Sequence, residues 1–140
     1  MLNFSINLTG LKNGKKLIEA EGQKILFNAM TQMQNIAKRR APVNTGLLRA
    51  SINLFPEAKL ASEYILACGV DYGIYVEYGT SPHYPPISPL KMWSRRVLGD
   101  EGAAYAVQQK IAKQGTPAQP FFRPALDEVK NIYLPRLLRT

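Results

Sequence analysis

Residues 41–51, which read APVNTGLLRAS, separate a helical pattern from a strand pattern and constrain the fold more than any other segment. Pro42 disfavours helical backbone at the residue before it and so ends the preceding helix. Asn44 or Thr45 can cap a short helical turn, and Gly46 permits a sharp bend. The chain is therefore predicted to change from a long helix to a sheet across this segment.

The residues before this segment follow the period of an amphipathic helix, with apolar side chains every three or four positions. These apolar positions are Ile18, Ile25, Leu26, Ala29, Met30, Met33, Ile36 and Ala37. One long helix is therefore predicted over residues 11–40. Its last turn holds Lys38, Arg39 and Arg40, where positive charge complements the helix dipole.

Alternating apolar and polar residues predict strands over residues 4–8 and 51–55, and the apolar run over residues 64–70 predicts a more buried strand. The connection after Pro56 is short enough for a hairpin. Two strands alone are marginally stable, so the long helix is expected to cover one face of the sheet. The predicted fold class is α+β, with a long N-terminal helix packed on a small antiparallel β-sheet and additional C-terminal helices.

Residues 70–80, VDYGIYVEYGT, fit two structures. Ile74, Tyr75 and Val76 could form a strand, since β-branched and aromatic residues favour strands. The spacing of Tyr75 and Tyr78 also suits a short helix, which Gly79 would then end. The sequence leaves strand and helix open here.

Residues 81–115 are predicted to form a loop followed by helices. Four prolines within residues 81–89 indicate an extended loop, and the Ser-Pro pair at residues 88–89 predicts the start of a helix through residue 97. Asp100 predicts the cap of a second helix, which Gly115 ends.

The end of the chain is predicted to be helical. Residues 116–120 form a rigid linker, and residues 121–138 form a last helical segment, interrupted by Pro135. Phe121 and Phe122 stand at its start. They are either core anchors or contacts between subunits, since aromatic residues are enriched at interface centres.

Length and charge bound the function classes. A chain of 140 residues is most simply one domain. The formal net charge of +8 favours an anionic partner, which is nucleic acid, an acidic protein face or a membrane surface, although a solvated surface explains it equally. No apolar run approaches the roughly 18 residues of a spanning helix, and the N-terminal residues lack the features of a signal peptide. No membrane partner is expected.

Catalytic and metal-binding chemistry is not expected. His83 is the single histidine, and no neighbour is specified that would activate it. Cys68 is the single cysteine and lies in an apolar run, where a thiol is usually inert. Without clustered ligands, no zinc or calcium site can be written, and no glycine-rich phosphate loop occurs. The chain is predicted to be non-enzymatic and to hold no metal or cofactor.

Two charged features are candidate binding sites. The densest basic cluster is either a contact with DNA phosphates or an acidic partner, or a solvated helix end; it comprises Lys38, Arg39, Arg40 and Arg49. Glu77 lies among tyrosines, and a partly buried carboxylate there needs a partner. Arg49 or Arg123 is predicted to be that partner.

Three glycine- and proline-punctuated blocks, taken in order, resemble the tail-completion, or head–tail joining, family of tailed bacteriophages and prophages. The blocks are residues 41–51 (APVNTGLLRAS), 72–80 (YGIYVEYGT) and 120–126 (PFFRPAL). The resemblance extends over most of the chain, from near residue 10 to near residue 130. One departure is the long insert over residues 81–115, where many relatives pass quickly from Gly-Thr to the Pro-Phe block.

The resemblance implies one tail-completion-like domain over residues 1–140, with residues 81–115 as a loop-plus-helix insert. Such proteins form a ring, often a hexamer, that ends the tail tube and joins it to the head neck. The implied partners are other copies of the chain, the tail-tube protein, the head-neck connector protein and phage DNA in the lumen. The implied location is the virion, with the host cytoplasm during assembly. Contacts with neighbouring proteins are expected from Tyr75, Glu77, Tyr78, Phe121, Phe122 and Arg123.

Two other functions stay open from the residues alone. A small basic DNA-binding regulatory protein fits the net charge and the cluster at residues 38–40, and its affinity for duplex DNA would fall steeply with salt. A small hydrolase would have to use His83.

Overall fold

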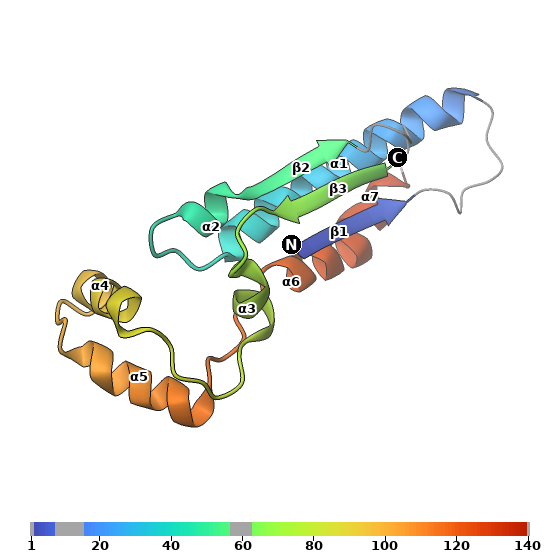
Figure 1. The fold of residues 1–140 in the computed structure, drawn as a ribbon. Helices are drawn as coiled ribbons and strands as arrows, with labels where there is room; N and C mark the ends of the chain where they lie inside the picture. Colours follow the sequence, from blue (N-terminus) through green and yellow to red (C-terminus); the bar gives the residue numbers. More distant parts are fainter. Residues whose placement is uncertain (1, 8–15, 57–62, 140) are drawn as a thin grey trace. The chain divides into compact units, whose positions relative to one another are not determined.

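The computed structural model describes residues 2–7, 16–56 and 63–139, which form an α+β fold (Figure 1). The elements in chain order are β1 (Leu2–Asn7), α1 (Lys16–Arg40), α2 (Leu47–Ala50), β2 (Ile52–Pro56), β3 (Glu63–Cys68), α3 (Gly73–Tyr78), α4 (Ile87–Val97), α5 (Ala103–Gln114), α6 (Phe122–Glu128), the π-helical turn η1 (Val129–Tyr133) and α7 (Leu134–Leu137). The predicted fold class is confirmed. Residues 8 and 11–15, which the strand and helix predictions also covered, lie outside the described residues.

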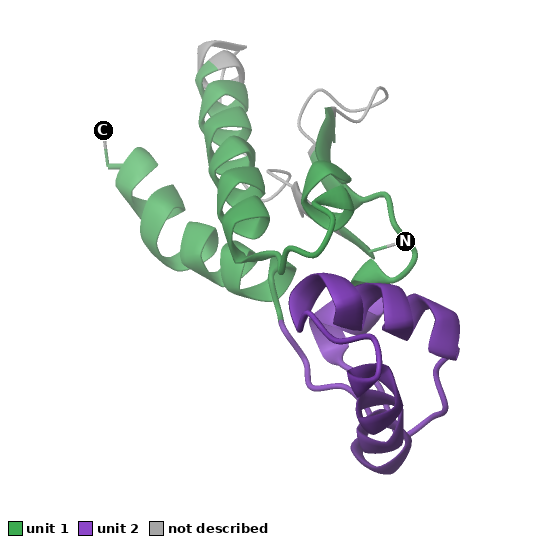
Figure 2. Ribbon diagram, turned by 90° about the vertical axis from the view of Figure 1, so that its left-hand side faces the viewer, with its two compact units in different colours: residues 1–73, 120–140 green, residues 74–119 purple. Residues whose placement is uncertain are grey.

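The chain divides into two compact units, drawn in green and purple in Figure 2. The first unit consists of Met1–Gly73 and Pro120–Thr140, and the second of Ile74–Gln119. The predicted insert, residues 81–115, lies within the second unit.

The sheet of the first unit has the strand order β1-β3-β2, with both pairs antiparallel. Leu2, Cys68 and Ile52 lie in one cross-strand row and are buried. Asn3 and Asn53 lie in the next row and are exposed. Successive residues of a strand point to opposite faces, so one face of this sheet is buried and the other is more open to solvent.

α1 lies between the sheet and the C-terminal helices, which explains its broad apolar face (Figure 2). Its buried residues recur at helical spacing and are Leu26, Ala29, Met30, Met33, Ile36 and Ala37. On the sheet side, the Phe27 and Tyr64 rings lie 5.7 Å apart, and Gln34 Nε2 donates to the carbonyl of Ile52 at 3.1 Å. A helix that contacts two layers needs apolar residues over much of its circumference.

The C-terminal helices form one continuous segment against α1. Phe121, Phe122 and Val129 are fully buried, and the two phenylalanine rings lie 5.0 Å apart, so these two phenylalanines are core anchors of the first unit. The predicted interruption at Pro135 takes the form of the π-helical turn η1 instead of a break. Proline lacks an N–H and its ring collides with a carbonyl one turn back in an α-helix, and a wider turn relieves that collision.

The sequence allowed either a strand or a helix within residues 70–80, and the structure forms a helix there. α3 occupies Gly73–Tyr78, and Gly79 follows it with a φ of 73°. Six residues are too few for periodicity to distinguish a strand from a helix.

The predicted caps of α4 and α5 are both wrong. α4 begins at Ile87, one residue before the predicted cap Ser88, because the first turn of a helix tolerates a proline such as Pro89. α5 begins at Ala103, and Asp100 Oδ1 accepts a hydrogen bond from the Gly102 N–H at 2.8 Å. Asp100 therefore stabilises the turn that leads into α5.

Two Gly-Thr dipeptides, at the two ends of the segment that carries α4 and α5, pair with each other. Thr80 and Thr116 form an antiparallel bridge, in which the Thr80 N–H donates to the Thr116 carbonyl at 3.0 Å and the reverse bond measures 3.2 Å. Their hydroxyl oxygens lie 2.7 Å apart. Gly79 and Gly115, which precede the two threonines, have φ values of 73° and 71°. This Gly-Thr bridge brings together the two ends of the segment that carries α4 and α5.

Candidate interaction surfaces

The turn after α1 brings the predicted basic residues together. Thr45 Oγ1 accepts a hydrogen bond from the Leu47 N–H at 3.3 Å, and Gly46 turns the chain with a φ of 85°. α2 begins at Leu47 with Gly46 as its N-cap, so the prediction that Asn44 or Thr45 caps this turn is wrong. Thr45 instead stabilises the turn one residue earlier. Arg49 then reaches back, and its guanidinium donates to the carbonyl of Ala41 at 3.4 Å, next to the last turn of α1.

The resulting surface is called the basic end of α1 and consists of Lys38, Arg39, Arg40 and Arg49. The three arginines are exposed, and Lys38 is half-buried. Arg40 forms a salt bridge with Glu128 of α6 at 3.3 Å. The Glu128 carboxylate offsets one of the four positive charges. The surface therefore retains a surplus of positive charge, which suits a phosphate or a carboxylate ligand.

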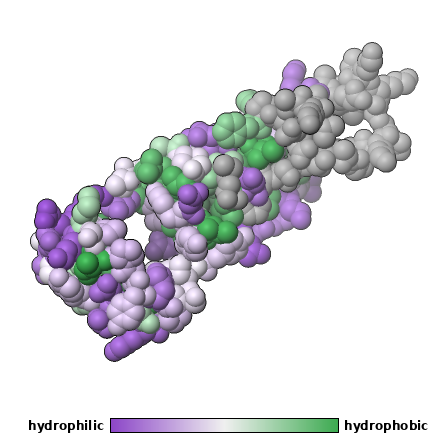
Figure 3. Space-filling view, in the orientation of Figure 1, coloured by the Kyte–Doolittle hydropathy of each residue, from purple (hydrophilic) through white to green (hydrophobic). Residues whose placement is uncertain are grey.

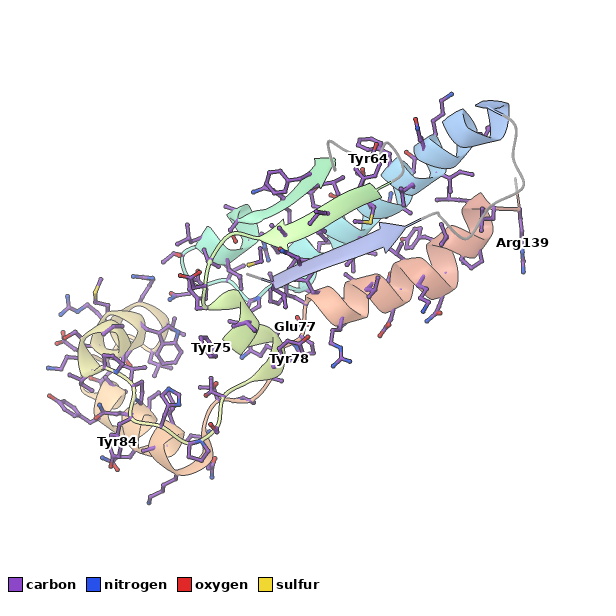
Figure 4. All side chains as sticks on the ribbon, turned by 45° about the vertical axis from the view of Figure 1, so that its right-hand side comes forward. Tyr64, Tyr75, Glu77, Tyr78, Tyr84 and Arg139 are labelled. Carbon is purple, nitrogen blue, oxygen red and sulfur yellow. The ribbon has the colours of Figure 1, made fainter. Side chains whose placement is uncertain are left out.

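α3 carries the second candidate surface, called the aromatic face of α3 and made of Ile74, Tyr75 and Tyr78. These side chains are 42%, 60% and 51% exposed. Tyr78 is three residues from Tyr75 and four from Ile74, so the three share one side of the helix. Glu77 of the same helix is buried, at 2% exposure. Figure 4 shows Tyr75, Glu77 and Tyr78 on this short helix.

The residues expected to contact neighbouring proteins fall into two groups. Tyr75, Tyr78 and Arg123 are exposed, whereas Glu77, Phe121 and Phe122 are buried in the structure. The contact role of the six residues stays a prediction. The pairing of Glu77 with Arg49 or Arg123 also stays a prediction.

A third surface was missed by the sequence reasoning. The exposed side of α4, called the outer face of α4, consists of Ser88, Pro89, Met92, Arg95 and Arg96. Met92 is 63% exposed, and the other four stand three or four positions from it, so they surround it on the helix. The signal in the sequence was a methionine followed at these spacings by two arginines, in a helix that contains no acidic residue.

Arg95 of this face is held by an ion pair with Glu101. The Arg95 guanidinium donates a hydrogen bond to Glu101 and its charge faces the carboxylate, and the two effects hold the pKa of Glu101 below its ordinary value; desolvation opposes them, and the charge of Lys91 adds slightly to the lowering. Because the folded-state pKa is lowered, the stabilisation is present above the ordinary pKa and is lost as the pH falls through the folded-state pKa.

Replacing Arg95 with glutamine is therefore expected to raise the pKa of Glu101 toward its ordinary value. The measurement is an NMR titration of the Glu101 side-chain carboxyl carbon. Arg96→Gln is the matched control and should leave this pKa where it is in the parent chain. Equal pKa values for Glu101 in the parent chain and in Arg95→Gln would contradict the assignment.

His83 and Cys68 contact backbone or neutral groups. His83 is exposed, and its Nδ1 lies 2.9 Å from the carbonyl oxygen of Ser81. Cys68 is buried, and its Sγ lies 3.4 Å from the Ser51 hydroxyl. Neither contact places a carboxylate or a second histidine beside these side chains.

Across residues 2–7, 16–56 and 63–139, no group of three or more histidine, cysteine, aspartate or glutamate side chains could hold a metal ion. Within the same ranges, no helix has the length and apolar character that crossing a membrane requires.

Polar and apolar residues intermingle on the face seen in Figure 3. No protein-family model, curated protein or solved structure matches this chain. The exposed surfaces on α1, α3 and α4 are therefore the basis for inferring what the chain binds.

Proposed function

We propose that this chain is a structural, non-enzymatic virion protein that forms a homo-oligomeric ring at the head-proximal end of a phage tail. There the ring ends the tail tube and joins it to the head neck. The observation that carries the proposal is the aromatic face of α3, which exposes Ile74, Tyr75 and Tyr78 within the second motif block. Exposed apolar groups rimmed by polar residues mark protein contacts, and tyrosine is enriched at their centres.

The motif blocks support the proposal because the first two turn the backbone beside an exposed surface and the third anchors the core. Gly46 of the first block turns the chain at the basic end of α1. Gly79 of the second block follows the aromatic face of α3. Phe121 and Phe122 of the third block are fully buried and anchor the C-terminal helices. The glycines and phenylalanines of the three blocks thus fix the backbone and the core that position the exposed surfaces. This arrangement is expected of a structural protein.

The sheet edges are a further proposed contact between copies. Among the described strands, β1 and β2 each pair on one side only, with β3. Unpaired strand edges accept strands of another chain. A head-to-tail contact closes into a ring when its repeated rotation returns to the first subunit.

The remaining partners follow from charge. The basic end of α1 is proposed to contact phage DNA in the lumen or an acidic neighbour in the neck or the tube. The proposed location is the virion, with the host cytoplasm during assembly.

Deletion of this gene from the phage that carries it is expected to yield heads and tails that do not join. Complementation with Tyr75→Asp should fail to restore joined virions, because a carboxylate would interrupt the aromatic face of α3. Tyr84→Asp is the matched control, since Tyr84 is 69% exposed and lies outside α3. The measurement is the fraction of joined virions in negative-stain micrographs. Normal joined virions from the deletion phage would refute the proposal.

The geometry of the basic end of α1 favours one second candidate, a DNA-binding regulatory protein. Arg49 is drawn back to Ala41, beside the three basic residues of the last turn of α1. Such a protein would bind duplex DNA with an affinity that falls steeply as salt rises. Absence of binding at low salt in a fluorescence-anisotropy titration would eliminate this candidate.

A further inference from the structure

The helices of the second unit are basic in a way that the proposed ring function does not explain. α4 and α5 contain no acidic residue, and their basic residues are Lys91, Arg95, Arg96, Lys110 and Lys113. The connection between the helices carries Asp100 and Glu101, and Glu101 is already paired with Arg95. A surface of this kind attracts an acidic partner.

The outer face of α4 combines this charge with an apolar centre. Met92 is 63% exposed and is surrounded by Arg95, Arg96, Ser88 and Pro89. Met92 is therefore the apolar centre of this face, and the two arginines and Ser88 form its polar rim. An apolar centre with a charged rim is the arrangement found in protein interfaces.

The composition favours a protein over a nucleic acid as the occupant. DNA backbones are contacted mainly by basic and polar groups, to which an exposed methionine adds little. Methionine and arginine are both enriched in protein interfaces, whereas lysine is depleted there. Both basic residues of the outer face of α4 are arginines.

The charge of the chain argues against a second copy as the occupant. The formal net charge is +8, so a second copy would bring like charge toward the two arginines. Like charges brought together across an interface are unfavourable. The occupant that complements this face is an acidic protein of a different kind.

One contact orders part of this face. Arg95 forms an ion pair with Glu101. Side chains that are already ordered lose less conformational freedom when a partner binds.

We propose that the outer face of α4 docks against an acidic surface of a different protein. The identity of that partner rests on the proposed function, which makes it the tail-tube protein or the head-neck connector protein. The Gly-Thr bridge, which joins the two ends of the segment bearing α4 and α5, would present this face as one structural element.

The test is complementation of the gene-deletion phage with a double variant, Met92→Asp with Arg96→Glu, called the face variant. The matched control is Lys24→Glu with Asn28→Asp on the exposed side of α1 in the first unit, which has the same spacing and the same change in charge. The face variant is expected to lower the yield of joined virions at least about tenfold, because a carboxylate would replace the apolar centre and a like charge would meet the acidic partner. The control should stay close to the parent chain. Equal yields from the two variants would overturn the inference.

A binding measurement identifies the occupant. The parent chain and both variants, each verified by circular dichroism, are titrated against four probes: purified tail-tube protein, purified head-neck connector protein, short duplex DNA and phosphatidylglycerol vesicles. Binding to one of the two proteins that weakens about tenfold in the face variant alone supports the inference. Binding to neither protein, or a face-specific loss only with DNA or with vesicles, overturns it.

Failure of the proposed function has a different signature. It would appear as normal joined virions when the whole gene is deleted. Failure of the present inference alone would appear as a deletion phage that needs the gene, together with a face variant that replaces the parent chain fully.

Discussion

Replacing Gly115 with alanine is expected to increase local unfolding of α4 and α5 in the second unit and to leave the first unit folded. A Cβ atom at this position would overlap the carbonyl oxygen of Thr80 and lie 2.8 Å from the carbonyl carbon of Ser81. The Gly-Thr bridge would have to separate to make room. Gly115 has φ 71° and ψ −161°, a backbone region essentially confined to glycine. Strain of about 1–3 kcal/mol for a side chain there, with two lost backbone hydrogen bonds at about 1 kcal/mol each, gives a cost of roughly 3–5 kcal/mol.

The effect is expected to stay within the second unit because the helices there bury little. The fully buried residues of α4 and α5 are Ser94 and Ala104, which are both small, and the Ser94 hydroxyl has no hydrogen-bond partner in the structure. The hydrogen bond from the Gln119 N–H to the Val76 carbonyl, at 2.8 Å, lies beside the bridge and would be strained with it. Regions with few buried apolar contacts open at a lower free energy than the core.

Hydrogen exchange followed by mass spectrometry measures this prediction, with Trp93 fluorescence as a second report from α4. Peptides from α4 and α5 should exchange faster in Gly115→Ala, while peptides from α1 and β3 should not change. Gly99→Ala is the matched control, because Gly99 has a φ of 72° and no atom within 4 Å of an added Cβ. Gly99→Ala should lower the stability of the second unit only by the backbone strain of a side chain at positive φ, about 1–2 kcal/mol. Equal exchange in the two variants would show that the bridge does not hold the second unit closed.

Replacing Phe122 with alanine is expected to lower the free energy of unfolding of the first unit by about 3–5 kcal/mol, the range for deleting a large buried aromatic side chain. Phe122 is fully buried, and its ring lies 5.0 Å from that of Phe121. Its loss would leave a cavity where α6 packs on α1, the helix that also covers the sheet. A loss of this size is a large part of the total stability of a small domain.

Urea denaturation followed by far-ultraviolet circular dichroism measures this change. The matched control is Phe55→Ala on β2, because Phe55 is 52% exposed. Its substitution should change the free energy of unfolding by less than about 1 kcal/mol. Similar losses in both variants would mean that Phe122 is not the core anchor that its burial indicates.

Local signals predicted most of the first unit. The apolar positions of α1 indicated a helix with a broad apolar face, and Pro42 and Gly46 marked where the chain turns. That turn lies within a few residues of the basic cluster, so Arg49 could be grouped with Lys38 from the sequence. The errors at Ser88 and Asp100 have a common cause, since several neighbouring residues are compatible with the first turn of a helix.

The candidate surfaces were only partly predictable. The contact role of Tyr75 and Tyr78 stays a prediction, and their exposure beside a buried Glu77 depends on which side of a six-residue helix is covered. The outer face of α4 was missed because Met92 is apolar, and an apolar residue in a helix is usually assigned to the core.

The sequence by itself determined the α+β class, the place where α1 ends and the positions at which glycine was needed, because periodicity and backbone preference act over a few residues. The tertiary structure alone decided which apolar residues are covered. Phe121 and Phe122 are buried while Tyr75, Tyr78 and Met92 are exposed. It also paired Thr80 with Thr116, two residues that the chain separates by the whole of α4 and α5. Burial and bridge formation depend on contacts between segments far apart in the chain, which no local pattern records.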